Sequence, residues 1–94
     1  MEIVKLDDTI FKKMTDYQME QAKKTIAECV SKGVGMYEIK DNDNIFPSKQ
    51  VMYERLKSCA YTHNHHNANK NNENLRAEVI TKNKKQQIIV VVKE

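Results

Sequence analysis

The run Ile88–Val92, near the C-terminus, constrains the fold more than any other feature of this 94-residue chain. It is the longest apolar run in the sequence, and its length suits a strand. Successive side chains of a strand point to opposite faces, so this strand is apolar on both of its faces. We therefore expect it at the centre of a sheet, or with a partner that covers its second face.

Two other segments supply further strands. Leu75–Thr81 largely alternates apolar and polar side chains, and the turn Lys82–Lys85 connects it to the strand Gln86–Lys93. Upstream, Val34–Lys40 has the composition of a short strand, and Asp41–Asn44 follows it as a turn. The pattern predicts a C-terminal β-hairpin within a small, mainly antiparallel sheet of three strands.

Helical signals occupy the rest of the first two-thirds of the chain. Asp7-Asp8-Thr9 is an N-cap cluster, which predicts a turn or two of helix. Thr15–Gln18 matches a capping box, so a second helix is expected to start at Thr15 and to end at Gly33. Pro47-Ser48 starts a further helix. Its buried stripe consists of Met52, Leu56, Cys59 and Ala60.

Together these elements predict an α+β fold: N-terminal helices and a three-stranded sheet with one packed helix and a C-terminal hairpin. Ninety-four residues suit one domain. We expect a single domain over 1–94, with a mainly helical part at 1–33 and a strand–helix–loop–hairpin part at 34–94.

Composition argues for an intracellular setting. The N-terminus lacks the apolar core of a signal peptide, and no segment approaches the roughly 18–20 apolar residues of a membrane span. We therefore expect no membrane partner and a cytoplasmic location, which is the host cytoplasm if the protein is viral. Cys29 and Cys59 are expected to be small buried residues in a reducing compartment, although a disulfide between them is an alternative.

The charge distribution points to the C-terminal half as a contact region. Residues 1–46 hold seven Lys and nine Asp/Glu, a charge of −2, whereas residues 47–94 hold nine Lys/Arg and four Asp/Glu, a charge of +5. A lysine-rich turn can contact nucleic-acid phosphates. The candidate residues are Lys70, Arg76, Lys82, Lys84 and Lys85. The alternative is a solvated turn whose lysines prevent edge-to-edge pairing of sheets.

Residues 62–74 form the most polar segment, with six Asn and three His, and are expected to be a loop. His63, His65 and His66 are the one cluster that suits a metal ion, but no Cys or carboxylate lies at ligand spacing. Cys59 precedes His63 by four residues, so the two side chains would be neighbours on a continuous helix. A nucleophilic thiol and the histidine that acts as its base need such proximity. Cys59 also fits an apolar stripe, and the sequence has no Gly-rich phosphate loop, no paired-carboxylate signature and no G-x-S-x-G turn. We therefore expect no metal, no cofactor and no enzyme activity.

The element order helix, strand, helix, strand, strand partly resembles a winged helix, in which Lys82–Lys85 would be the tip of the wing. That fold has a further helix before the wing, where this chain has the polar segment 62–74. Within residues 34–94, a further pattern consists of Met36–Ile39, Phe46–Ser48, Tyr53–Tyr61 and Ile88–Val92. This pattern resembles that of many small uncharacterised bacteriophage proteins. This resemblance implies an accessory phage protein and no particular mechanism.

Two functions from different classes follow as expectations. The first is non-catalytic contact with nucleic acid through the basic C-terminal half. The second is inhibition of a host protein, as in takeover or counter-defence by an anti-CRISPR-like factor. Its apolar interface would use Tyr37, Ile89 and Val91, or else the exposed face of a helix. A homodimer paired through an exposed edge of Ile88–Val92 is a third arrangement.

Overall fold

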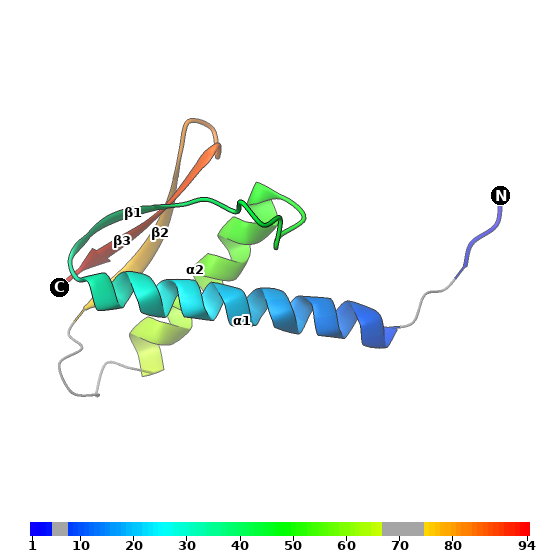
Figure 1. Cartoon of the computed structure of the whole chain (residues 1–94), viewed down its shortest axis with the longest axis horizontal. Helices are drawn as coiled ribbons and strands as arrows, with labels where there is room; N and C mark the ends of the chain where they lie inside the picture. The colour runs from blue at the N-terminus through cyan, green and yellow to red at the C-terminus, as the bar shows by residue number, and fades with distance from the viewer. Residues whose placement is uncertain (5–7, 67–74) are drawn as a thin grey trace.

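The computed structural model describes residues 1–4, 8–66 and 75–94, and of residues 8–14 and 66 only the backbone. Two helices and three strands follow one another as α, β, α, β, β (Figure 1). The elements are α1 (Asp8–Lys32), β1 (Gly35–Ile39), α2 (Lys49–His66), β2 (Arg76–Lys82) and β3 (Gln87–Lys93). The predicted α+β fold with a C-terminal hairpin is confirmed.

The apolar run occupies the middle of the sheet. The strand order is β1-β3-β2, and both pairings of β3 are antiparallel. Ile88, Val90 and Val92 are no more than 1% exposed and face the helices. Both edges of β3 are paired, so this strand does not have the exposed edge on which the predicted homodimer depends.

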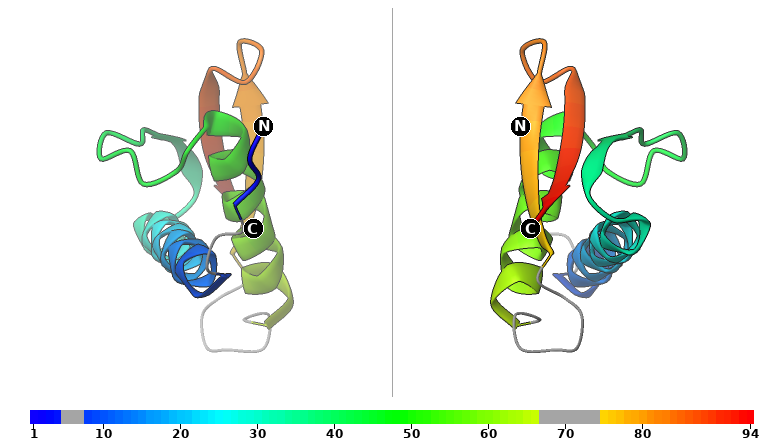
Figure 2. Two further views of the ribbon diagram at one scale, coloured as in Figure 1. Left: turned by 90° about the vertical axis from the view of Figure 1, so that its right-hand side faces the viewer. Right: turned by 90° about the vertical axis from the view of Figure 1, so that its left-hand side faces the viewer.

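Both helices cover the same face of the sheet (Figure 2). α2 packs along β2, and α1 packs against α2 and the sheet. Ala22, Ile26, Met52 and Leu56 are among the helix residues that meet the sheet in one core. The N-terminal half of α1 extends beyond the sheet (Figure 1).

The N-terminal helical part differs from its prediction. A new helix was expected at Thr15, but a single helix of 25 residues runs through this position from Asp8 to Lys32. No Gly or Pro interrupts this segment, so nothing in the backbone opposes a continuous helix. Gly33 ends the helix as predicted, with a φ of 92° and its N–H donating to the Val30 carbonyl at 3.0 Å.

The start of α2 is as predicted, but its end is not. The Val51 N–H donates to the Ser48 hydroxyl at 3.2 Å, which is the bond of an N-cap. The loop predicted from residue 62 is wrong for 62–66, because α2 continues to His66. The Asn64 side chain binds the backbone of β2, and this tertiary contact outweighs the low helix propensity of Asn. Residues 67–74 lie outside the described residues.

Two further observations bear on the cell-biological expectations. No helix in the described part of the chain is long and apolar enough to cross a lipid bilayer. Cys29 and Cys59 are both buried and free, so the predicted buried thiols are confirmed and the disulfide is not formed.

Candidate nucleic-acid interface

The turn between β2 and β3 lies at the projecting end of the hairpin (Figure 1), and its lysines are exposed. Asn83, Lys84 and Lys85 all have positive φ, at 52°, 56° and 71°. Asn tolerates this left-handed region, whereas for Lys it is uncommon. The Gln86 N–H donates to the Asn83 carbonyl at 3.2 Å and closes the turn. The side chains of Lys82, Lys84 and Lys85 are consequently exposed together.

The first turn of α2 lies against the same end of the hairpin. The Lys49 ammonium donates to the Gln86 carbonyl at 2.6 Å, and the Lys85 ammonium donates to Gln50 Oε1 at 2.9 Å. Gln50 Nε2 in turn donates to Glu54 Oε1 at 3.0 Å, so the hydrogen-bonded network that includes Lys85 also contains one carboxylate. We call the set Lys49, Lys82, Lys84 and Lys85 the basic tip. Lys49 is 37 residues from Gln86, and no local pattern predicts their contact.

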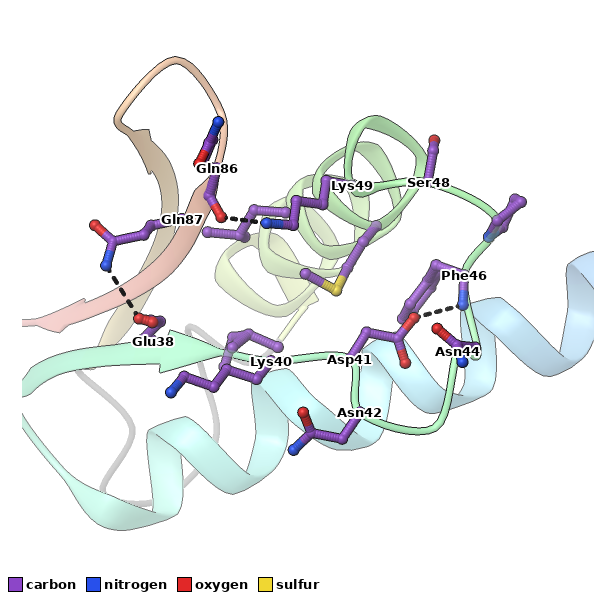
Figure 3. A pocket seen from close by; sticks show the side chains of 14 residues that line it. Glu38, Lys40, Asp41, Asn42, Asn44, Phe46, Ser48, Lys49, Gln86 and Gln87 are labelled. Carbon is purple, nitrogen blue, oxygen red and sulfur yellow. Dashed lines mark hydrogen bonds between the residues drawn. The ribbon is translucent and has the colours of Figure 1, made fainter.

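A cleft of ≈ 440 Å³ runs beside the basic tip, between the end of β1, the following loop and the start of α2 (Figure 3). Lys40 and Lys49 bring positive charge to its wall. The Asp41 carboxylate is occupied, because it accepts from the backbone N–H groups of Ile45 and Phe46 at 2.8 Å each. Its role is therefore to hold the predicted turn, and not to meet a ligand.

The other two predicted nucleic-acid contacts do not join the basic tip. Arg76 starts β2, six residues before Lys82, which places their backbones about 20 Å apart along the strand. Its guanidinium donates to the Asn64 carbonyl at 3.0 Å. Lys70 lies outside the described residues. The structure thus brings together three of the five predicted cations and adds Lys49.

The predicted protein-contact residues lie on two different faces of the sheet. Tyr37 packs against the core on the helix side, and its hydroxyl donates to the Gly33 carbonyl at 2.7 Å. Ile89 and Val91 lie on the face that the helices leave open, where the register pairs them across strands with Ile80 and Met36 respectively. Met36 is 61% exposed, whereas Ile89 is only 8% exposed.

The open face also carries an ion pair. The Lys93 ammonium lies 2.7 Å from Glu78 Oε2. This hydrogen bond, together with the positive charge of Lys93, lowers the pKa of the Glu78 carboxyl below its usual value. Glu78 is therefore neutralised within the chain.

Cys59 and His63, the possible nucleophile and base, lie away from the basic tip. Both line a hollow of ≈ 680 Å³ between α1 and α2. The Cys59 thiol lies 3.7 Å from the Met19 carbonyl. Burial raises the pKa of this thiol, although the charges of Lys23 and Arg55 act in the opposite direction. A thiolate is thus disfavoured, which is the reverse of what a nucleophilic cysteine needs.

The histidines do not form a metal site in the described part of the chain. No group of three His, Cys, Asp or Glu side chains there is placed to hold a metal ion. His65 instead lies against Tyr61, with ring centroids 4.1 Å apart, whereas His63 lines the hollow between the helices.

Comparison with known proteins gives no independent indication of function. No protein-family model, no curated protein and no solved structure matches the chain. Function is therefore inferred from the geometry and charge of the residues described above.

Proposed function

We propose that the protein binds nucleic acid without catalysis, through contacts between the basic tip and backbone phosphates. The observation that carries the proposal is the arrival of Lys49 beside the turn that exposes Lys82, Lys84 and Lys85. Two segments far apart in sequence thereby contribute cations to one projecting surface. In the described residues, neither Lys82 nor Lys84 has a side-chain partner that a phosphate would need to displace.

The polarity of α2 supports the same site. Lys49 is the first residue of this 18-residue helix, so the helix end that carries partial positive charge lies next to the hairpin turn. Lysines on flexible stems act as point charges and do not read base edges. The proposal is therefore for contact with little sequence preference.

The affinity of such a surface depends on salt. Each phosphate that is neutralised on duplex DNA contributes about −0.9 to the slope of log K against log salt concentration. Four lysines thus predict a slope of about −3 to −4. Measurement of the dissociation constant by fluorescence anisotropy, with labelled duplex and single-stranded probes across a salt series, gives this slope.

A triple variant tests the assignment to the basic tip. Replacement of Lys82, Lys84 and Lys85 by Glu is expected to abolish binding at moderate salt. A matched control replaces Lys23, Lys24 and Lys32, which are exposed on α1, by Glu. Both variants change the net charge equally. Equal binding by the tip variant and the parent, or equal losses in both variants, would contradict the proposal.

We propose an accessory role in a bacteriophage as the biological setting, with inhibition of a host protein as the second candidate function. The open face of the sheet favours the second candidate, because Met36 is 61% exposed there and pairs with the apolar residue Val91. Val91→Asp should then prevent capture of the host protein while the fold persists. Capture that survives this substitution would argue against the open face.

A further inference from the structure

The outer edge of β2 lies open beside α2. Four residues of α2 and five of β2 line a groove of ≈ 470 Å³ along this edge. We call it the edge groove. Its lining consists of Tyr53, Lys57, Ala60 and Tyr61 on α2, and of residues 77–81 on β2. The volume lies within the range of about 300–1,000 Å³ that is usual for ligand sites.

One residue of α2 already pairs with this edge as a neighbouring strand would. The Asn64 side-chain amide donates to the Ala77 carbonyl at 2.8 Å and accepts from the Ala77 N–H at 2.9 Å. Both backbone groups of Ala77 therefore point away from β3. A carboxamide that makes these two bonds reproduces one peptide unit of an added strand.

The same geometry fixes the direction of the next backbone groups. In an antiparallel pair, the residues whose N–H and C=O point outward alternate with those that bond across the ladder. The register of β2 with β3 has no bulge, so Val79 and Thr81 share the outward orientation of Ala77. In the described residues, no hydrogen-bond partner meets the outward groups of Val79 and Thr81.

We propose that the edge groove binds an extended segment of a partner polypeptide, which adds a fourth strand to the sheet beside Val79 and Thr81. Outward N–H and C=O groups repeat every second residue along the edge, about 6.7 Å apart, which is the repeat of an extended peptide. A helix has no free backbone groups in this arrangement. This proposal goes beyond nucleic-acid binding and uses a different surface.

The walls of the groove indicate the chemistry of the segment. The Lys57 ammonium lies 5.6 Å from the centre of the Tyr53 ring, and in the described residues it has no carboxylate partner. The one carboxylate of the groove, Glu78, is paired with Lys93. Tyr61, which is 66% exposed, provides an aromatic wall. An acidic side chain on the segment would meet Lys57.

A second copy of the chain fits this groove less well. A two-fold contact sets the same patch of each copy against the other. The uncompensated positive charge of Lys57 in one copy would then lie close to that of Lys57 in the other. Like charges in that arrangement oppose pairing.

Selection from a random decapeptide display library against the full chain tests the proposal. We expect enrichment of peptides that alternate β-branched residues with Asp or Glu. Thr81→Pro removes an N–H that points outward and leaves the ladder with β3 intact, since proline is tolerated on such an edge. It should weaken binding of the enriched peptide at least about tenfold.

Two controls make the result independent of any folding defect. N-methylation of single backbone positions in the enriched peptide should weaken binding at alternate residues only, while the protein is unchanged. Lys57→Glu should weaken the binding of acidic peptides. Lys84→Glu should leave peptide binding unchanged and reduce nucleic-acid binding. The two proposals can therefore fail separately.

Several results would overturn the inference. One is that no peptide is selected, and another is that the Thr81→Pro variant and the parent bind the enriched peptide equally well. A third is that N-methylation weakens binding at successive peptide positions and not at alternate ones only. Enrichment of basic peptides would overturn it too. A concentration-dependent dimer that Thr81→Pro abolishes would assign the groove to a second copy of the chain. Displacement of the enriched peptide from Lys57 by an oligonucleotide would assign the groove to nucleic acid.

Discussion

The two ends of the α2–β2 pair are held together by opposite kinds of chemistry. At one end, Lys49 and Lys85 connect the start of α2 to the hairpin turn through exposed ammonium groups on flexible stems. At the other end, the Asn64 amide makes two half-buried hydrogen bonds to Ala77. A ligand can replace the first kind of contact at little cost, whereas the second kind fixes the backbone. This difference supports our proposal that the basic tip contacts a ligand, whereas Asn64 fixes the start of β2.

The largest effect is expected from a substitution in the hydrophobic core between the two ends. Leu56 is completely buried and lies on α2 between the basic tip and Asn64. We expect Leu56→Ala to reduce the free energy of unfolding by about 2–5 kcal/mol, because it leaves a cavity in the core. Chemical denaturation measures this loss. If one end kept its native amide exchange while the other unfolded, the two ends would not share a core.

A smaller effect is expected at the Asn64 end. Asn64→Ala leaves both backbone groups of Ala77 without their partner, at a cost of about 1–3 kcal/mol. Faster amide exchange should appear in the last turns of α2 and at Ala77, and not in the hairpin turn. Unchanged exchange at Ala77 would mean that Asn64 does not fix the start of β2.

The corresponding change at the basic tip should affect binding more than folding. Replacement of Lys49 and Lys85 by Met removes two exposed hydrogen bonds, and should change stability by less than about 0.5 kcal/mol. The salt slope of duplex binding should decrease in magnitude by about 2. Loss of stability comparable to that of Asn64→Ala would remove the contrast between the two ends.

The smallest effect concerns pH. Because Lys93 lowers the pKa of Glu78 in the folded state, the ion pair contributes stability above the pKa of an unfolded Glu. That contribution is lost as the pH falls through the lower, folded value. Carbon-13 titration of the Glu78 carboxyl should show the lowered midpoint, and Lys93→Met should raise it. A midpoint unaffected by Lys93→Met would mean that the ion pair does not form in solution.

The sequence predicted local features better than contacts between distant segments. The side-chain pattern predicted Ile88–Val92 either at the centre of a sheet or against a covering partner, and the strand order shows that it is central. The start of α2 at Pro47-Ser48 followed from capping chemistry. The continuation of α2 past Thr62 did not, because it depends on Asn64 reaching Ala77.

The candidate site shows the same division. An exposed group of Lys82, Lys84 and Lys85 followed from the turn sequence. The addition of Lys49 depends on how α2 lies against the hairpin turn. The separation of Arg76 from Lys82, in contrast, follows from the length of the strand between them. The outward groups of Val79 and Thr81 likewise become visible only once the strand order is known.

Chemical-shift mapping would locate the surface that contacts DNA. A short DNA duplex would be titrated at low salt into the ¹⁵N-labelled chain, and amide shifts followed residue by residue. We expect the largest changes at Lys49 and across residues 82–87, with little change at Asn64 or Arg76. Changes concentrated at the Asn64 end, or no changes at all, would contradict this expectation.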